Sequence, residues 1–257
     1  MATTLVMAMQ KGGVGKTTTT LSLGVALAER GARVLLIDID PQANLTQGLG
    51  IDPAEVEYSI YEVLLNPEHG TSFATITTPH AGERLHLVPS TLALAGAELE
   101  LAGKVGRELL LRKALKQSRD QYDYILIDPP PSLGLFTLNA LTCADAVIVP
   151  LQVHAYALKA MPQLEATIEL VKDLNPALGI GGIVCTLADR RTNLSQLVET
   201  QIRATYGDVV FATVIPMNTK LAEAPAVGSP ISHYAPESVG AKAYAALAEE
   251  LEARYGR

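Results

Sequence analysis

The sequence predicts one doubly wound α/β domain, with a mostly parallel sheet flanked by helices. Short, continuously apolar runs alternate with longer stretches of helical periodicity, as in parallel strands that helices cover on both faces. The chain has 257 residues, 48% of them hydrophobic, which is enough for one large core. Because no linker rich in Ser, Pro or Gly interrupts this alternation, we expect a single domain over residues 1–257.

The expected elements follow one another along the chain. The strand candidates are residues 5–9, 33–37, 85–88, 124–127, 146–149, 180–185 and 212–215. The helix candidates are residues 17–29, 59–65, 109–118, 155–174, 194–206 and 237–255. Ser59 and Glu62 have the spacing of a capping box, and Gly31 suits the position just after a helix end. We assign residues 66–84, the most polar segment, as a loop.

Composition restricts the classes of function. Lys and Arg number 20 against 27 Asp and Glu, so the formal net charge is −7 and any binding of DNA requires a local basic patch. No apolar run is long enough to span a bilayer, and the N-terminus lacks the basic region of a signal peptide. Cys143 and Cys185 have no partners at metal or redox spacing, so we expect a cytoplasmic protein.

The segment QKGGVGKTT, between the first strand and the first helix, has the residues of a phosphate-binding loop. Its glycines let backbone N–H groups turn toward phosphate oxygens, and the helix N-terminus adds positive charge. Lys16 should reach the β- and γ-phosphates of ATP, and the hydroxyl of Thr17 should ligate Mg²⁺. A glycine-rich turn that merely opens a helix is the alternative. The expected nucleotide-binding residues of this segment are Lys11, Gly12, Gly13, Val14, Gly15, Lys16, Thr17 and Thr18.

Two acidic motifs complete the predicted site, making the fold one of P-loop NTPase type. YDYILID is a hydrophobic strand that ends in Asp128, which would hold Mg²⁺ through water. In LLIDIDPQ, Asp38 and Asp40 leave the second strand on the same side. Asp40 could position the attacking water, and Asp38 is a further candidate metal ligand. Capping of the following loop is the alternative for either residue.

The motifs KGGVGKTT, IDIDPQAN, YDYILIDPPPSLG and TNLSQLVET…VIPMNTKLAEAP…GSPI resemble the ParA/Soj group of deviant Walker ATPases, which partition bacterial chromosomes and plasmids. The resemblance extends over residues 5–244. It implies a homodimer that forms when ATP is bound, associates with the nucleoid and binds double-stranded DNA without sequence specificity. It also implies a ParB-type centromere-binding protein that stimulates hydrolysis and releases the DNA.

The same resemblance assigns roles to single residues. Lys11 matches the signature lysine that crosses to the partner subunit's nucleotide, and Asp40 matches an aspartate required for hydrolysis. With Lys16 they are the expected catalytic residues. Asn218, next to Pro216 and Met217, matches an adenine contact. Arg191 and Lys220, with the adjacent Arg190, match basic positions implicated in DNA binding. The chain departs from the family pattern at Pro129, Met217 and Ala43.

The charges of residues 189–220 are nearly balanced, because Arg190, Arg191, Arg203 and Lys220 face Asp189, Glu199 and Asp208. An ordinary solvated surface is therefore an equal alternative for the monomer. A dimer would double the phosphate contacts on one face, so we expect DNA binding that requires ATP and weakens steeply with salt. With no arginine finger evident near the site, intrinsic turnover should be slow.

Other members of the superfamily are the competing interpretations. A MinD-like positioning ATPase would need a basic amphipathic helix at the C-terminus, whereas this end reads ALAEELEARYGR; we therefore expect no membrane binding. A nitrogenase-type iron protein needs cysteine pairs, which are absent, and a superfamily synthetase is the other metabolic option. A signalling GTPase lacks support because the Asn-Lys-x-Asp motif is missing.

Because the chain starts at the first expected strand, we expect no DNA-binding domain ahead of it.

Overall fold

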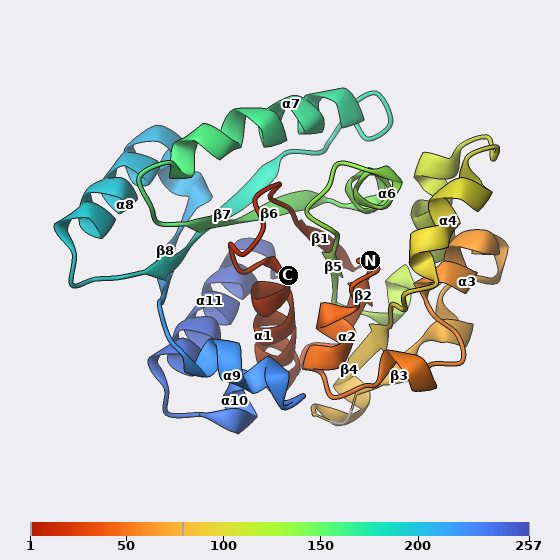
Figure 1. Cartoon of the computed structure of the whole chain (residues 1–257), viewed down its shortest axis with the longest axis horizontal. Helices are drawn as coiled ribbons and strands as arrows, with labels where there is room; N and C mark the ends of the chain where they lie inside the picture. The colour runs from red at the N-terminus through yellow and green to blue at the C-terminus, as the bar shows by residue number, and fades with distance from the viewer. Residues whose placement is uncertain (1, 79, 257) are drawn as a thin grey trace.

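A central sheet with helices on both faces organises the computed structural model, which describes residues 2–78 and 80–256 (Figure 1). The sheet has eight strands in the order β3-β4-β2-β5-β1-β6-β7-β8. All neighbouring pairs in this sheet are parallel except β3 with β4. The strands are β1 (Thr3–Met7), β2 (Val34–Asp38), β3 (Ile76–Thr77), β4 (Leu85–Val88), β5 (Tyr124–Asp128), β6 (Ala146–Gln152), β7 (Ile180–Ala188) and β8 (Val210–Pro216).

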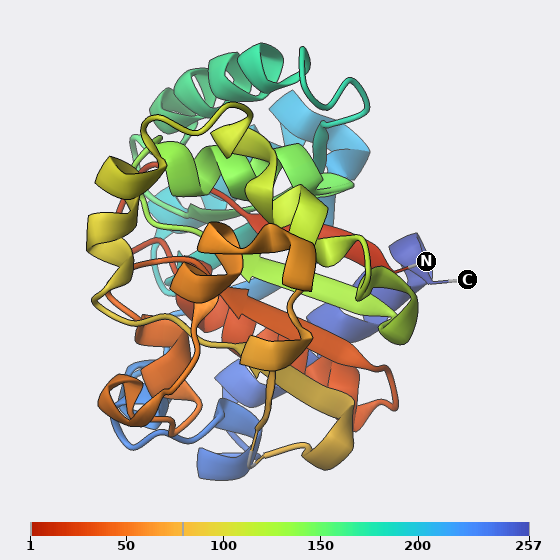
Figure 2. The ribbon, with the colours of Figure 1, turned by 90° about the vertical axis from the view of Figure 1, so that its right-hand side faces the viewer.

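The helices connect these strands across the two faces of the sheet. They are α1 (Lys16–Glu29), α2 (Asn44–Gly48), α3 (Ile60–Leu65), α4 (Leu94–Leu101), α5 (Leu110–Leu115), α6 (Leu135–Cys143), α7 (Met161–Val171), α8 (Asn193–Tyr206), α9 (Lys220–Ala226), α10 (Ile231–Tyr234) and α11 (Val239–Tyr255). Figure 2 shows α7 on one face of the strands and α1 with α11 on the other. The predicted doubly wound α/β architecture is therefore confirmed.

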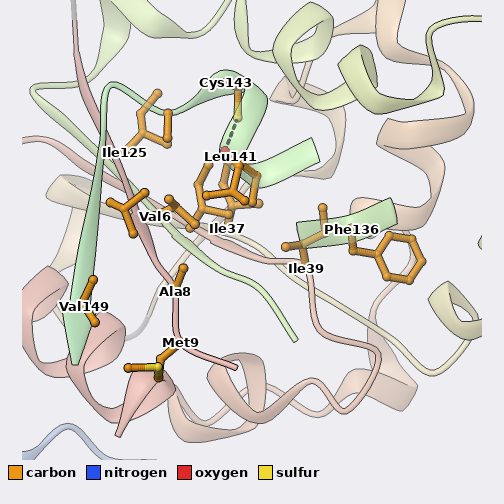
Figure 3. Packing of buried hydrophobic residues seen from close by; sticks show 14 of the residues in the cluster. Val6, Ala8, Met9, Ile37, Ile39, Ile125, Phe136, Leu141, Cys143 and Val149 are labelled. Carbon is orange, nitrogen blue, oxygen red and sulfur yellow. Dashed lines mark hydrogen bonds between the residues drawn. The ribbon is translucent and has the colours of Figure 1, made fainter. Parts of the chain in front are cut away.

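Each central strand contributes to two hydrophobic cores. Along β1, Val6 packs toward α3–α8, whereas Leu5 and Met7 pack toward α1 and α11. Figure 3 shows the first core, where Val6, Ile37 and Ile125 from neighbouring strands meet Leu141 of α6. Because successive side chains of a strand point to opposite faces, a strand buried on both faces must be apolar throughout. This explains the continuous apolar runs of the sequence.

Local signals placed several element ends correctly. The Ser59 hydroxyl accepts a hydrogen bond from the backbone N–H of Tyr61, and the Glu62 carboxylate accepts one from the N–H of Ser59 at 2.7 Å. Gly31 follows α1 in a left-handed conformation with a φ of 104°, as a glycine after a helix end commonly does. The capping box and the glycine were both predicted from the sequence.

Other boundaries differ from the sequence prediction for identifiable reasons. Helix α7 starts at Met161 rather than at residue 155, because Pro162 occupies its first turn and a 3-10 turn precedes it. Met161, Leu164, Ile168 and Val171 of this helix are buried, whereas Leu158 lies in that 3-10 turn and is only partly buried. The segment assigned as a loop, residues 66–84, contains the short strand β3.

Among the described residues, no helix is long and apolar enough to cross a membrane.

Candidate functional site

The phosphate-binding loop links the end of β1 to the start of α1. The strand order changes direction at β1, and such a point is where ligands bind in doubly wound sheets. Gly13 and Gly15 have φ angles of 73° and 92°, which favour glycine. A Cβ built on Gly12, Gly13 or Gly15 would meet open space, so no packed side chain covers the loop at these glycines. Backbone N–H groups around such a space suit phosphate oxygens.

The rest of the molecule holds this loop in place. The side chain of Val14 is buried in the first core, and its carbonyl accepts a hydrogen bond of 2.8 Å from the hydroxyl of Thr186 on β7. Lys16 opens α1 and is itself buried. Burial lowers the pKa of the Lys16 ammonium, and the charges of Asp128 and Asp40 partly oppose that effect. An anionic phosphate would stabilise the same charge.

Thr17 and Asp128 form the candidate magnesium centre. The Thr17 hydroxyl donates to Asp128 Oδ2 at 2.7 Å, and Thr20 donates to the other carboxylate oxygen at 3.2 Å. Burial raises the pKa of Asp128 to about 6, although the Thr17 hydrogen bond and the Lys16 charge lower it. A hydroxyl beside a buried carboxylate, at the mouth of an open phosphate cradle, fits an oxygen-coordinated Mg²⁺ that also binds nucleotide and water.

Asp38 lies opposite Asp128 in the register of β2 and β5 and is fully buried. One of its oxygens accepts hydrogen bonds from the Thr46 N–H and hydroxyl, at 2.9 and 2.8 Å, and the other accepts from the Asp40 N–H. Burial, followed by the negative charge of Asp128, raises the pKa of Asp38 to about 7. These contacts are those of a loop cap, the alternative role that the sequence analysis gave for Asp38. Its role as a metal ligand stays a prediction.

Asp40 lies beyond the end of β2, and its side chain accepts a hydrogen bond of 3.0 Å from the N–H of Gln42. Its negative charge raises the pKa of both Lys16 and Asp128, so Asp40 lies within electrostatic range of the two residues. The next turn contains Ala43, a non-glycine residue with a φ of 54°. Glycine adopts this left-handed conformation without strain, which explains why the family pattern has glycine where this chain has Ala43.

A cavity of about 530 Å³ adjoins the loop between α1, α2 and α9. Figure 1 shows α2 and α9 on either side of α1. Asn218 lines the cavity, and its Oδ1 accepts a hydrogen bond of 2.8 Å from the N–H of Lys220. Leu187 also lines it, with a left-handed φ of 52° that the sequence did not predict. Pro216 lies outside this cavity, at the end of β8.

A larger hollow of about 1000 Å³ lies beside the first and shares Gln47, Pro225 and Ala226 with it. Its charged lining residues are Asp52, Glu57 and Glu62, and no element of the phosphate-binding loop reaches it. Acidic side chains would repel a triphosphate, so the smaller cavity is the better candidate for the nucleotide.

Lys11 does not line that cavity. Its exposed ammonium donates to the side chain of Gln152 at 3.1 Å and contacts Nε2 of His154, both at the end of β6. The sequence did not single out either partner, because they are 141 and 143 positions away from Lys11.

The predicted basic residues are held by different partners. Arg191 forms two hydrogen bonds of 2.8 Å with the carboxylate of Asp189, and Lys220 pairs with Glu223 at 2.7 Å. Arg190 has no ion pair among the described residues, and it lines a surface hollow together with Lys242 of α11. Lys242 pairs with Glu237 at 2.9 Å and lies outside the motif-bearing segment, so the sequence did not single it out.

Comparison with known proteins agrees with this geometry. A family model described as an AAA domain matches residues 2–180. The sporulation initiation inhibitor protein Soj of Bacillus subtilis is 49% identical over 245 residues, which cover 95% of this chain and 96% of that protein. The chromosome-partitioning ATPase Soj of Treponema pallidum is 45% identical over 258 residues, with 100% of both chains covered.

Among solved structures, the cobyrinic acid a,c-diamide synthase of Mycobacterium smegmatis, with a bound ATP analogue and magnesium, superposes with a TM-score of 0.84. It is 40% identical, and the match covers 100% of this chain and 98% of that one. With relatives up to 49% identical along almost its whole length, the chain belongs to the ParA/Soj family of deviant Walker ATPases.

Proposed function

We propose that the chain, as one ATPase domain over residues 1–257, is an ATP-dependent DNA segregation ATPase. The position of Lys11 carries the proposal. Its ammonium lies outside the cavity of its own subunit, held by Gln152 at 3.1 Å, and is exposed at the face that surrounds the phosphate-binding loop. From there, once it leaves Gln152, it could meet the nucleotide of a facing subunit, which a lysine inside the cavity could not. The partition ATPases among its relatives favour the same function.

The proposed reaction is hydrolysis of ATP by water, with attack on the γ-phosphorus and departure of ADP. Lys16 and the backbone N–H groups of the loop would hold the β- and γ-phosphates, and Asp40 would orient the attacking water. Thr17 and, through water, Asp128 would hold Mg²⁺, which when bound neutralises charge on the phosphate oxygens. Lys11 of the facing subunit would stabilise the charge that develops in the transition state. Turnover would therefore be slow in a monomer.

The proposed dimer binds DNA through Arg190, Arg191 and Lys220, with Lys242 nearby. Each subunit contributes few cations, and Arg191 and Lys220 are paired internally with Asp189 and Glu223. Two copies of the patch are needed before phosphate contacts outweigh the acidic net charge of −7. A ParB-type partner would then stimulate hydrolysis and end the DNA-bound state. The proposed localisation is the cytoplasm, in association with the nucleoid.

Sizing of the wild type and of Asp40→Ala, with and without Mg-ATP, tests this proposal. We expect a stable dimer for Asp40→Ala with Mg-ATP and monomers for both proteins without nucleotide. Titration of arbitrary duplex DNA against salt should then show affinity only in the ATP-bound state. Absence of both the dimer and the salt-sensitive binding would refute the proposal.

A MinD-like membrane ATPase is disfavoured by the packing of α11. Its large apolar residues Tyr244, Leu247 and Leu251 are buried in the second core, so these side chains are not available to lipid. Sedimentation with anionic vesicles and Mg-ATP should leave the protein in the supernatant.

An amide-forming synthase is the second candidate, favoured by the 40% identity to the cobyrinic acid a,c-diamide synthase. A glutamine-dependent amide synthase commonly uses a reactive thiolate to release ammonia. Cys143 and Cys185 are buried, and burial raises the pKa of their thiols to about 12 and about 11. We expect no increase of ADP formation when cobyrinic acid and glutamine or ammonia are added.

A further inference from the structure

The side chain of Lys11 has a defined binding place within its own subunit. Gln152 is the last residue of β6, and its side-chain oxygen accepts from the Lys11 ammonium at 3.1 Å. His154 contributes Nε2 at 2.5 Å from the same ammonium. Thr186 of β7 pairs with Gln152 in the sheet and also holds the Val14 carbonyl, so this place is fixed relative to the phosphate-binding loop.

The contact between His154 and Lys11 depends on which nitrogen of the imidazole carries the proton. Nδ1 of His154 accepts a hydrogen bond of 2.9 Å from the backbone N–H of Tyr156. A neutral imidazole has one acceptor nitrogen and one N–H, whereas an ammonium group can only donate. When Nδ1 accepts from Tyr156, Nε2 therefore carries the proton and faces the Lys11 ammonium donor to donor. The N–H of Tyr156 and the ammonium of Lys11 thus compete for one lone pair.

We propose that Gln152 and His154 are positioning residues that retain Lys11 within a nucleotide-free subunit and release it when a second ATP-bound copy approaches. This inference rests on the proposed function, because it supplies the state from which Lys11 crosses to the facing nucleotide. The competition at His154 keeps the retaining contact weak, so that a phosphate of the facing subunit can displace it. The hydrogen bond to Gln152 orients the Lys11 ammonium toward the end of β6.

The charges around His154 reinforce this weakness. Burial, followed by the charge of Lys11, lowers the pKa of His154 from its ordinary 6.5. The groups that face the imidazole are the Lys11 ammonium and the ring of Tyr156, and the Lys159 ammonium lies over that ring at 4.8 Å. The charged groups here are thus cations. A protonated His154 has no lone pair and repels Lys11, so acidification also releases the lysine.

Nuclear magnetic resonance of the histidine rings tests the contact directly, in the full-length chain without nucleotide. We expect Lys11→Met to raise the pKa of His154, because a neighbouring positive charge disappears. Lys159→Met is the matched control, since its ammonium lies over Tyr156 rather than on His154, and it should shift that pKa much less. An unchanged His154 pKa in Lys11→Met would overturn the inference.

The release step is tested with the same signal in Asp40→Ala, which keeps Lys11. Formation of the Mg-ATP dimer should raise the pKa of His154 as Lys11→Met does in the monomer. A dimer that forms without this change would refute the release, whereas failure to form any dimer would refute the proposed function instead. Gln152→Leu should tighten ATP-dependent dimerisation about threefold to tenfold, the size of one lost hydrogen bond. His154→Phe should tighten it by less, because the His154 contact is the weaker of the two. Unchanged or weaker dimerisation in both variants would contradict the retaining role.

Discussion

The hydroxyl of Thr17 lies 2.7 Å from the carboxylate of Asp128, although 111 positions separate the two residues in the chain. The register of the sheet creates this proximity, because β1 and β5 are paired in parallel and their carboxyl ends meet at one edge. A metal ion that binds both groups must replace their hydrogen bond. The protein thus holds two oxygen atoms of the candidate magnesium site close together.

Thr17→Ala should weaken the Mg²⁺-dependent part of ATP affinity by about 10- to 100-fold, because a hydroxyl ligand is lost while the phosphate cradle remains. Titration with a fluorescent ATP analogue, with Mg²⁺ and with EDTA, measures the difference. Thr17→Ser is the matched control because it restores the hydroxyl. If Thr17→Ala and Thr17→Ser bound Mg-ATP equally, Thr17 would not be a ligand.

Lys11→Ala and Lys16→Ala should separate two roles for lysine in one loop. Lys16 is buried at the start of α1, so its loss should abolish nucleotide binding. Lys11 lies outside the cavity, so its loss should preserve ATP affinity and remove dimerisation and stimulated hydrolysis. Nucleotide titration and sizing of both variants give the comparison. ATP-dependent dimers of Lys11→Ala would identify Lys11 as an ordinary surface lysine.

The nucleotide-free protein should lose stability as the pH rises. The folded-state pKa of Asp38 is about 7 against an ordinary 3.8, so its protonated form favours the folded state. Its stabilising contribution is complete below pH 3.8 and is lost as the pH rises through 7.

Asp38→Asn cannot ionise, so between pH 5 and 8 the wild type should lose about 2–3 kcal/mol more unfolding free energy than the variant. Urea unfolding at both pH values measures this. Asp123→Asn is the control of opposite sign, because Arg33 lowers the pKa of Asp123. A variant as pH-dependent as the wild type would exclude Asp38 as the source.

Release of Arg191 from its internal partner should strengthen DNA binding. Asp189 holds Arg191 through a two-bond ion pair on the exposed surface, so Asp189→Asn should raise affinity for duplex DNA severalfold. The salt dependence should steepen by about 0.9 in its logarithmic slope for each additional phosphate that the protein neutralises. Glu199→Gln is the matched control, because its partner Arg203 also donates to the carbonyls of Phe211 and Ala212.

The double change Arg191→Glu with Lys220→Glu should abolish DNA binding and leave ATP affinity intact. Fluorescence anisotropy with labelled duplex at several salt concentrations tests this double variant and Asp189→Asn. Retained DNA binding in the double variant would show that the patch lies elsewhere.

Ala43→Gly should stabilise the protein slightly, by about 0.5 kcal/mol. A left-handed alanine costs about 1–2 kcal/mol, and the added freedom of glycine in the unfolded chain offsets about 0.4–1 kcal/mol of the relief. Ala26→Gly inside α1 is the control and should destabilise by about 1 kcal/mol. Urea unfolding of both variants gives the comparison, and equal losses would show that Ala43 is unstrained.

Sequence reasoning located the strands well and the helices unevenly. The central strands are apolar on both faces, which leaves a clear signal in the chain. Helices α2, α4, α6, α9 and α10 were not anticipated, because α2 and α10 are only a few residues long and α4 and α6 lack a strong polar face. Such segments become helical through packing rather than through periodicity.

The α/β class, the phosphate-binding loop with its two lysines, and Asp128 at the acidic end of a strand could all be predicted from the sequence. These features depend on short-range patterns of glycine, charged and apolar residues, which determine local structure without any distant contact. The tertiary structure was needed to show that Asp38 accepts hydrogen bonds from Thr46 and that Lys11 lies against Gln152 and His154. The partners of Lys11 come from the end of another strand. Parallel pairing brings strand ends together regardless of their distance in the chain, so such contacts leave no local pattern.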